Sequence, residues 1–426
     1  MKVAIIGSGG REYALSRKIA SSPLVDHVFR LPGSGGDMDK TTRVDIKGKD
    51  VEGLRKFALD QRIDLAVVGP EDALALGVVD EFEGAGLKII GPRRKTAALE
   101  YSKIFTRELL ATFKDVSPHF DVFGDTASAR ASIRNRGVYP TVIKVDGLAA
   151  GKGAMVCPGP DAVDAALRRI ESGEFGEAGK KFVVEEFLEG EEASYIVLVD
   201  RKGHILPLAG SQDHKAIFDG DKGPNTGGMG AYSPAPVLAP EVEQRTLDRI
   251  VRPTIEAMAE RGMPFTGFLY TGLMIDPKGN PHVVEFNVRL GDPETQPIVA
   301  RLETDIVEVF LAMLDGSLDK AVLKWTPRAA VTVVMAAKGY PDSNAYKKGD
   351  RIRGIEDAEA MGAIVDHAGV KKIGEDLFTD GGRVLGVTAL GETFEGAIEK
   401  AYRAVRKISW GSEYYRTDIG RRALNR

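Results

Sequence analysis

The sequence has little cysteine, no long apolar run and no excess of basic residues. Its one cysteine among 426 residues is Cys157, which rules out an internal disulfide bond and favours a reducing compartment. No stretch approaches the roughly 20 apolar residues that a membrane-spanning helix needs, so we expect no membrane partner. Residues 1–7 lack the layout of a signal peptide, and we expect them to form a strand of a cytoplasmic protein.

The charged residues are nearly balanced, with 58 Lys and Arg against 62 Asp and Glu and a formal net charge of -4. A dedicated nucleic-acid-binding protein usually has a basic excess, so the composition argues against nucleic acid as a partner. It leaves room for a local basic pocket that binds a small anion. The length allows two to four domains, and we take a monomer as the working expectation.

Four short apolar runs punctuate the first hundred residues, at 3–6, 28–31, 65–68 and 87–90. Each run is followed at once by glycine or proline, and helical patterns lie between the runs. Strand, turn and helix in this order predict a doubly wound parallel α/β sheet. Because ligands bind such sheets beyond the carboxyl ends of the strands, the turns predict a ligand site along one edge.

The rest of the chain predicts a mixed α and β region followed by a small α/β unit. Helical patterns cover residues 102–110, 161–170 and 240–259, and strand patterns cover 142–145, 154–156 and 182–184. Strands dominate from 193 to 287 around a glycine-rich loop at 212–234, whose length is typical of functional loops. The last unit contains predicted strands at 329–337 and 384–387 and an amphipathic helix at 394–405.

The glycine-rich turn after the first strand predicts a phosphate site. Residues 7–12 open a helix whose backbone N–H groups and dipole can receive an anion, with Arg11 as a cationic partner. A dinucleotide fingerprint fits less well, because Glu12 stands at the place of the third glycine and no acidic residue ends the second strand. A purely structural tight turn is the alternative.

Two further loops carry groups suited to a phosphorylated ligand. Glu71 ends the loop Gly69-Pro70-Glu71 and can accept hydrogen bonds from hydroxyls or an amine, although a glutamate that begins a helix is an equal alternative. The loop 147–153 resembles a P-loop but is one residue short and has no Ser or Thr after Lys152. Strands flank it, so it predicts a glycine hairpin near phosphates, with Lys144 in reach; an ordinary hairpin is the alternative.

An acidic run follows the strand at 182–184. Its sequence is Glu185-Glu186-Phe187-Leu188-Glu189-Gly190-Glu191-Glu192. We expect Glu189 and Glu191 to be solvated, as in an ordinary charged surface. The apolar pair inside the run, Phe187 and Leu188, predicts a hinge with an apolar side suited to a purine ring.

The stretch Glu285-Phe286-Asn287-Val288-Arg289 is the most informative short segment. The two-residue repeat of a strand puts Glu285, Asn287 and Arg289 on one face. A carboxylate and an amide oxygen are ligands suited to Mg²⁺ that carries nucleotide phosphates, and Arg289 can steady phosphoryl charge or a substrate carboxylate. A strand with a polar outer face is the alternative. The cluster at 290–294, which contains Asp292, follows at once and is unusual for packing alone.

Asp213, His214 and Lys215 precede a second glycine-rich run at 223–234. His214 alone would be an unremarkable surface histidine. Together with its two charged neighbours and the glycine-rich run, it predicts part of a small-molecule site.

These segments, in this order, resemble the glycinamide ribonucleotide synthetases, a branch of the ATP-grasp superfamily. The resemblance runs nearly end to end and rests on residues 7–14, 69–71, 144–153, 185–194, 212–236 and 285–296, with weaker support from 339–341 and 381–384. It implies three domains: an amino-terminal α/β domain over 1–100, an ATP-grasp domain over 101–325 with a lid at about 121–190, and a carboxyl-terminal α/β domain over 326–426.

The resemblance implies three substrates, namely ATP, glycine and 5-phosphoribosylamine. The residues implied for ATP are Lys103, Lys144, Gly151, Lys152, Gly153, Glu185, Glu186, Phe187, Leu188 and Glu192. The residues implied for the other two substrates are Gly9, Gly10, Arg11, Glu12, Pro70, Glu71, Asp213, Lys215, Gly228, Arg289 and Asp292. Glu285 and Asn287 would bind Mg²⁺ or Mn²⁺. Catalytic roles would fall to Lys152, Asp213 and Arg289, the last two beside glycine.

The sequence departs from the family pattern at four positions. The family usually has His where Tyr13 stands, Asn where Ser34 stands, Arg where Ala216 stands and Phe where Leu290 stands. We expect the first three to lie near the phosphoribosylamine side of the site. Many ATP-grasp enzymes also have a metal-binding acid on the strand before the Glu–Asn pair, but residues 270–275 contain none, so only two protein metal ligands are expected.

The implied reaction joins the carboxyl group of glycine to the amine of phosphoribosylamine through glycyl phosphate, with ATP converted to ADP and phosphate. No Ser-His or Cys-His arrangement is evident in the sequence, which suits a reaction without an enzyme nucleophile. Three alternatives are kept: an ATP-grasp ligase or carboxylase for a different acid, a nicotinamide-dependent oxidoreductase built on the first domain, and a nucleotide-binding regulator without chemistry.

Overall fold

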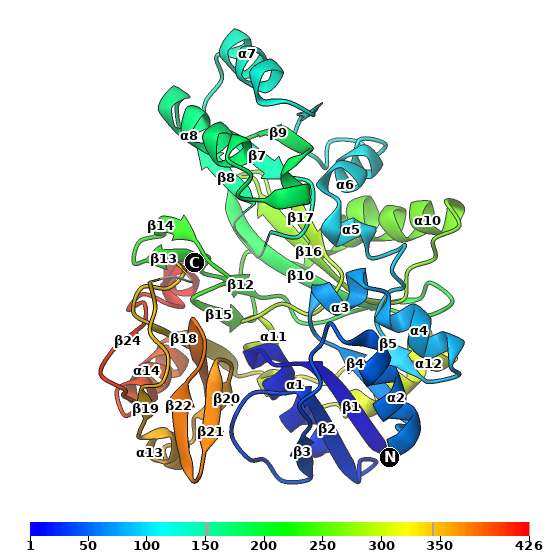
Figure 1. Ribbon diagram of the computed structural model, residues 1–426, viewed down its shortest axis with the longest axis vertical. Coiled ribbons are helices and arrows are strands. Elements are labelled where there is room, and N and C mark those ends of the chain that lie inside the picture. The colour runs from blue at the N-terminus through cyan, green and yellow to red at the C-terminus, as the bar shows by residue number, and fades with distance from the viewer. Residues whose placement is uncertain (150–152, 343–344, 426) are drawn as a thin grey trace.

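Five parallel strands form the sheet of the amino-terminal part, drawn in blue in the computed structural model of Figure 1. Their order is β3-β2-β1-β4-β5, with β1 Lys2–Gly7, β2 His27–Pro32, β3 Thr41–Arg43, β4 Leu65–Val68 and β5 Ile89–Ile90. The helices of this part are α1 Gly10–Ala20, α2 Val51–Gln61, α3 Glu71–Ala75 and α4 Val78–Gly84. The four predicted strands are present, and β3 is an additional edge strand. The structure describes residues 1–149, 153–342 and 345–425.

The carboxyl ends of these strands share one edge, because all neighbours in the sheet run parallel. Gly7, Pro32 and Pro70 line one cavity at that edge, as the turns predict. Gly7 has a φ of +124°, and a Cβ there would lie 2.7 Å from Glu12 Cγ, so a side chain is excluded at this turn. Gly91, after the fourth predicted strand, packs against Gly267 instead of the cavity.

The predicted lid is an antiparallel sheet with its own apolar core, at the top of Figure 1. The strand order is β6-β9-β7-β8, with β6 Phe120–Phe123, β7 Thr141–Val145, β8 Ala154–Cys157 and β9 Phe182–Glu186. The helices α7 Thr126–Arg136 and α8 Pro160–Glu171 cover it, while α5 Ala98–Tyr101 and α6 Lys103–Leu110 lead into it. Ser102 caps α6, because its hydroxyl accepts a hydrogen bond from the N–H of Phe105 at 3.2 Å.

A second antiparallel sheet lies between the lid and the amino-terminal part. Its order is β11-β10-β16-β17, with β10 Glu191–Val199, β11 Ile205–Pro207, β16 Gly267–Ile275 and β17 Pro281–Asn287. The predicted helix at 240–259 is α9 Pro240–Thr246, a π-helical turn Leu247–Val251 and α10 Arg252–Glu260. The chain continues through α11 Thr295–Arg301 and α12 Ile306–Asp315. This sheet and the amino-terminal sheet share two apolar cores, whereas the lid and the carboxyl-terminal part each have a separate core.

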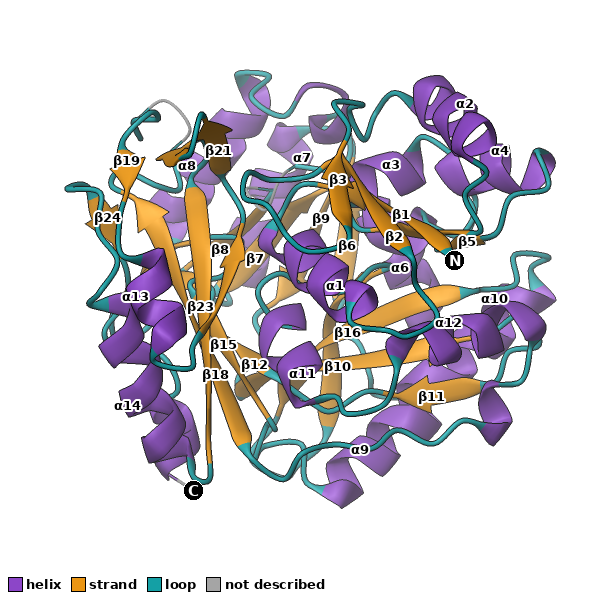
Figure 2. Cartoon of the chain, turned by 90° about the horizontal axis from the view of Figure 1, so that it is seen from below, coloured by secondary structure: helices purple, strands orange, loops and turns teal. Residues whose placement is uncertain are grey.

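The carboxyl-terminal sheet takes up strands from the middle of the chain. Its order is β12-β15-β18-β23-β20, with β12 Gln212–Asp213, β15 Gly230–Ser233, β18 Ala329–Ala337, β20 Ile364–His367 and β23 Arg383–Gly391; β24 Glu413–Tyr414 also pairs with β18. The helix α14 Phe394–Val405 packs on one face and α11 on the other, as Figure 2 shows. The segment predicted as one long loop thus contributes β12 and β15, and it also forms a small hairpin of β13 Ala216–Phe218 and β14 Lys222–Asn225.

A small three-stranded sheet completes the carboxyl-terminal part. Its order is β19-β22-β21, with β19 Arg351–Ile352, β21 Val370–Ile373 and β22 Asp376–Thr379. The helix α13 Ile355–Ala360 packs against α14 and β20. The predicted strands at 329–337 and 384–387 and the helix at 394–405 are confirmed. Within the described ranges of the chain, no helix is long and apolar enough to cross a bilayer.

Candidate active site

Two cavities meet beyond the carboxyl ends of the amino-terminal strands. The first lies among the lid, the sheet of β10, β16 and β17, and the segment around β12. The second lies at the edge of the amino-terminal sheet. Glu71, Gly227, Arg289 and Asp292 line both, so a ligand in one cavity can reach a ligand in the other at this point.

Most of the predicted nucleotide and metal residues line the first cavity. They are Lys103, Lys144, Gly153, Glu185, Glu186, Phe187, Leu188, Glu192, Glu285 and Asn287. Asp213, Lys215 and Arg289 join them there. Gly151 and Lys152 lie outside the described residues. Three cavity residues that the sequence motifs did not single out are Glu100, Arg107 and Tyr270.

A buried cluster of charges anchors the lid end of the first cavity. Arg107, on α6, makes two hydrogen bonds to the carboxylate of Glu185, on β9, at 2.6 and 2.8 Å. Lys144, on β7, lies 2.8 Å from the same carboxylate and donates to the carbonyl of Val284 at 2.8 Å. Burial lowers the pKa of Lys144 to about 8. Burial also opposes ionisation of Glu185, but Lys144 and Arg107 outweigh it and hold the pKa of Glu185 at about 2.

β17 and the residues just after it carry the predicted acid, amide and guanidinium groups into the first cavity. Phe286 and Val288, between them in the sequence, are buried in the core on the other side. Glu285 Oε1 lies 3.6 Å from Lys215 Nζ. Burial opposes ionisation of Glu285, yet Lys215, Lys103 and Lys144 outweigh it and hold its pKa far below the usual range. The cavity therefore presents an ionised carboxylate beside the amide of Asn287.

Arg289 is held by three side chains where the two cavities meet. Its Nη2 donates to Asn287 Oδ1 at 2.9 Å and lies 3.1 Å from Glu100 Oε1. Its Nε donates to Glu71 Oε2 at 3.2 Å. Although burial disfavours the charged form, Glu100 and Glu71 raise the pKa of Arg289, so the guanidinium stays protonated. A ligand that bonds to Arg289 must share it with these carboxylates.

Two buried acids face each other beside the meeting point. Asp213 is 6% exposed and Glu294 is 3% exposed. Across residues 1–149, 153–342 and 345–425, Asp213 Oδ1 has no hydrogen-bond partner, whereas Glu294 Oε1 accepts a hydrogen bond from Ser194 Oγ at 3.0 Å. Burial and Glu294 raise the pKa of Asp213 well above its usual range. An ammonium group would relieve this repulsion, so the pair is suited to an amine ligand.

The second cavity is lined mostly by glycine, basic and acidic residues. The predicted residues there are Gly9, Arg11, Glu12, Pro70, Glu71, Arg289 and Asp292. Lys47, Lys49, Tyr340 and Arg383 also line it. Lys47 and Lys49 lie in the polar loop between β3 and α2, which has no recognisable motif. Tyr340 and Arg383 come from the carboxyl-terminal part. Five cationic side chains, including Arg11 and Arg383, make this cavity suitable for a phosphate group.

Glu12 holds the glycine turn together. Its carboxylate accepts a hydrogen bond from the N–H of Gly9 at 2.6 Å and pairs with Arg11 Nε at 2.6 Å. Gly10 lines neither cavity; a Cβ on it would lie 2.7 Å from Gln296 Nε2, because α1 packs closely on α11. Gly228 lies behind Asp213, where a Cβ would come within 2.7 Å of Oδ1.

Two of the departures from the family pattern lie at a contact between the amino- and carboxyl-terminal parts. Tyr13 stacks on His367, with ring centroids 4.6 Å apart and planes inclined by 20°. Ser34 Oγ donates to the carbonyl of His367 at 2.7 Å. Neither residue lines the two cavities, and Ala216 lies on the far side of the segment that carries Asp213 and Lys215.

Three family models match the chain, and together they cover most of its length. The phosphoribosylglycinamide synthetase N domain matches residues 1–100, the ATP-grasp (A) domain of the same enzyme matches 101–295, and its C domain matches 330–422. The chain belongs to the phosphoribosylglycinamide synthetase family. The resemblance inferred from the motifs is thereby confirmed.

Individual members of the phosphoribosylglycinamide synthetase family match the chain along its whole length. The chain is 49% identical over 429 residues to a phosphoribosylamine–glycine ligase of Vibrio vulnificus, covering 100% of this chain and 99% of the relative. The crystal structure of a phosphoribosylamine–glycine ligase from Thermotoga maritima is similar with a TM-score of 0.83 and 31% identity, covering 98% of this chain and 100% of that one. The predicted fold class is therefore confirmed.

The family fold extends to more distant proteins. The biotin carboxylase domain of a Hydrogenobacter thermophilus 2-oxoglutarate carboxylase, solved with MgADP and bicarbonate, matches with a TM-score of 0.71 at 16% identity. The match covers 97% of this chain and 91% of that one. At this identity the likeness concerns the fold alone.

Proposed function

We propose that this protein joins glycine to 5-phosphoribosylamine with ATP, giving glycinamide ribonucleotide, ADP and phosphate, as a step of purine synthesis in the cytoplasm. The observation that carries the proposal is the junction of the two cavities at Arg289 and Asp292. One cavity has the charges and the apolar side chains that a nucleotide needs, and the other has the cations that a phosphorylated sugar needs. The membership of the family supports the names of the substrates.

ATP would lie in the first cavity, between the lid and β17. Lys103, Lys144 and Gly153 would contact its phosphates, and the family pattern assigns the same role to Gly151 and Lys152. The adenine would lie beside Phe187 and bind backbone groups at Glu185, Glu186 and Leu188, with Glu192 near the ribose. The Glu185 side chain is already paired with Arg107 and Lys144, which supports a backbone role.

A divalent metal ion, Mg²⁺ or Mn²⁺, would bind at Glu285 and Asn287. These residues fit such an ion, since Glu285 is an ionised carboxylate beside an amide oxygen in the same cavity. Within the described part of the chain no cluster of three or more His, Cys, Asp or Glu residues could hold a metal, so nucleotide phosphates and water would complete the shell. The bound ion would neutralise charge on the transferred phosphoryl group.

The two smaller substrates would meet at Arg289. The ammonium group of glycine would lie beside Asp213, where the unpartnered Oδ1 and Glu294 attract a cation. The glycine carboxylate would face Arg289. The family pattern assigns Lys215 to phosphoribosylamine, although Lys215 lines the first cavity and not the second. Phosphoribosylamine would occupy the second cavity, its phosphate near Gly9, Arg11 and Glu12 and its ribose and amine near Pro70, Glu71 and Asp292. The family pattern also assigns Gly10 and Gly228 to this substrate, but both lie behind the lining of the cavity.

The reaction would proceed in two steps. An oxygen of the glycine carboxylate attacks the γ-phosphorus of ATP, which forms glycyl phosphate and releases ADP. The amine of phosphoribosylamine then attacks the acyl carbon, forms the amide and expels phosphate. Neither step needs an enzyme nucleophile, so positioning and charge neutralisation by Lys152, Arg289 and Asp213 would carry the catalysis.

An acid panel tests the proposal against its alternatives. Phosphate release is measured with ATP, freshly made phosphoribosylamine and one acid at a time, including glycine, alanine and bicarbonate. We expect glycine to give the fastest release and release to depend on phosphoribosylamine. Faster release with another acid would indicate a different ligase or carboxylase. ATP binding without phosphate release would indicate a regulator, and tight NADH binding without ATP binding would indicate an oxidoreductase.

A further inference from the structure

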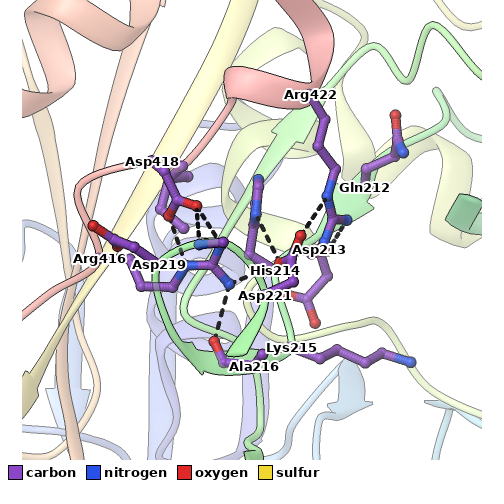
Figure 3. Close-up of polar contacts among 12 residues, drawn as sticks. Gln212, Asp213, His214, Lys215, Ala216, Asp219, Asp221, Arg416, Asp418 and Arg422 are labelled. Atoms are coloured by element: carbon purple, nitrogen blue, oxygen red, sulfur yellow. Dashed lines mark hydrogen bonds and ion pairs between the residues drawn. The ribbon is translucent and has the colours of Figure 1, made fainter. Parts of the chain in front are cut away.

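The last residues of the chain lie against the segment that carries Asp213 and Lys215 (Figure 3). Side chains alternate along an extended segment, so Asp213 and Lys215 face the first cavity while His214 faces the opposite side. The residues at 414–422, which we name the tail segment, cover that opposite side. None of its members lines the first cavity.

One set of contacts with the tail segment fixes the backbone at Asp213 and His214. Arg422 Nη1 donates to the backbone carbonyl of Asp213 at 3.1 Å, and its Nη2 lies 2.6 Å from Asp221 Oδ1. The N–H of Gly420 donates to His214 Nε2 at 3.1 Å. Because Nε2 accepts this bond, the neutral imidazole carries its proton on Nδ1, which faces Asp221 at 3.7 Å.

A second set of contacts with the tail segment fixes the backbone that follows Lys215, from Ala216 to Asp221. Arg416 is fully buried and donates through Nη1 to the carbonyl of Ala216 at 3.0 Å and to Asp221 Oδ1 at 3.0 Å. It also makes two hydrogen bonds of 2.8 Å to Asp418, whose Oδ2 accepts from the N–H of Gly220 at 2.8 Å. Burial opposes ionisation of Asp418, but Arg416 holds its pKa at about 2, so these bonds join full charges.

On the side that faces the first cavity, the side chains of Asp213 and Lys215 are held only loosely. Asp213 Oδ1 has no hydrogen-bond partner among the residues that the structure describes. Lys215 Nζ lies 3.6 Å from both Glu192 and Glu285, beyond normal hydrogen-bond length. The direction of both side chains therefore depends on their backbone. Hydrogen bonds to residues 226–231 hold this backbone along its edge. On the side away from the cavity, Arg422 holds it at Asp213 and Arg416 holds it at Ala216.

We propose that the tail segment is a positioning element of the active site, in which Arg422 and Arg416 set the direction of Asp213 and Lys215 by holding the backbone between them. Asp221 links the two arginines. Neither arginine lines either of the two cavities. The proposal rests on the proposed function, because it concerns where Asp213 meets the amine of the acid substrate.

Arg422→Met tests the proposal, since it removes the bond to the Asp213 carbonyl and leaves the fully buried Arg416 in place. We expect the KM for glycine to rise about five- to ten-fold, as for the loss of one charge-assisted hydrogen bond, with less than about a two-fold change in the KM for ATP. Arg422→Lys keeps a cation at this position and should recover most of the affinity for glycine. Arg421→Met is the matched control, because Arg421 is exposed and, among the described residues, its side chain makes no hydrogen bond or ion pair.

Amide hydrogen exchange of residues 212–218 provides a readout that is independent of turnover. Exchange there should be faster in Arg422→Met than in Arg421→Met, while exchange in the lid stays unchanged. An unchanged KM for glycine together with unchanged exchange, or an equal rise of every KM, would overturn the positioning role. If the wild-type protein makes no glycinamide ribonucleotide, the proposed function fails, and the exchange measurement still decides whether Arg422 fixes the segment.

Discussion

At the scale of single residues, Arg289 is the side chain that lines both cavities and contacts functional groups of each. It bonds to Asn287, a proposed metal ligand, and pairs with Glu71 and Glu100, so it couples the nucleotide side to the phosphoribosylamine side. Strand periodicity predicted that Glu285, Asn287 and Arg289 share a face. Periodicity could not predict Glu100, because it reaches the site only through packing of a segment distant in the sequence.

Glu285→Gln tests the metal site with little change of shape. The neutral amide should bind a divalent ion weakly, so ADP release with both substrates should fall about 100-fold or more. A higher Mg²⁺ concentration should restore part of it. ADP release would be measured in parallel for Glu189→Gln, in which the glutamate is exposed and does not line the cavity. Wild-type turnover in Glu285→Gln would contradict the metal assignment.

Lys144 predicts a dependence of nucleotide binding on pH. Burial lowers its pKa to about 8, and a lysine is charged below its pKa, so the cation is present at pH 7 and lost as the pH rises through about 8. The dissociation constant for ATP should therefore increase between pH 7 and pH 9.5, as calorimetry without the other substrates can measure. Lys144→Arg keeps its charge over this range and should flatten the profile. A flat profile in the wild type would refute the role of Lys144.

At the scale of elements, α6 connects the lid to the central sheet through Arg107. This side chain bonds to Glu185 on β9 and to the carbonyls of Val283 and Val284 on β17. The sequence predicted the helix, three of the four lid strands and β17, but neither β6 nor this contact. A strand period or a helical period identifies an element and its apolar face, whereas a buried ion pair depends on which elements become neighbours.

Arg107→Met should be strongly destabilising, because it leaves the carboxylate of Glu185 buried with only Lys144 as a cationic partner. We expect a loss of about 3 kcal/mol in the free energy of unfolding, measured by calorimetry. Arg93→Met is the control, since Arg93 pairs with Glu83 at 2.6 Å near the surface, where an ion pair contributes about 1 kcal/mol or less. Equal effects of the two substitutions would show that the buried cluster does not hold the lid.

The middle of the chain shows a second difference between prediction and structure. Residues 212–234 have many glycines and no long apolar run, which predicted a loop. In the structure β15 pairs with β18, nearly a hundred residues later in the sequence, and β12 pairs with β15. Such short strands are stabilised by partners distant in the sequence, so a local pattern cannot reveal them.

At the scale of the whole molecule, the carboxyl-terminal part completes the site and packs against the amino-terminal part. It supplies Arg383 and Tyr340 to the second cavity. Its β20 lies beside α1, where Arg17 pairs with Asp366 at 3.2 Å and Tyr13 stacks on His367. His367 Nδ1 donates to the carbonyl of Gly35 at 2.6 Å, which requires no charge on the ring.

This contact predicts a loss of stability in mild acid. Burial lowers the pKa of His367 from 6.5 to about 4, so below pH 6.5 the unfolded chain takes up a proton that the folded protein does not. The contribution of the neutral His367 ring to the free energy of unfolding is complete above pH 6.5 and is lost as the pH falls to about 4. This loss amounts to about 3 kcal/mol. In His367→Gln the decrease in unfolding free energy between pH 7.5 and 4.5 should be smaller by about this amount. An identical acid dependence in the variant would contradict the buried neutral state.

The most direct measurement of the central claim follows an oxygen atom. Glycine labelled with ¹⁸O in its carboxylate is incubated with the protein, ATP, Mg²⁺ and freshly made phosphoribosylamine, and the products are analysed by mass spectrometry. We expect equal amounts of ADP, phosphate and glycinamide ribonucleotide, with one ¹⁸O in the phosphate, because the carboxylate oxygen leaves with the phosphoryl group. ADP formation without the amide, or amide formation with unlabelled phosphate, would contradict it.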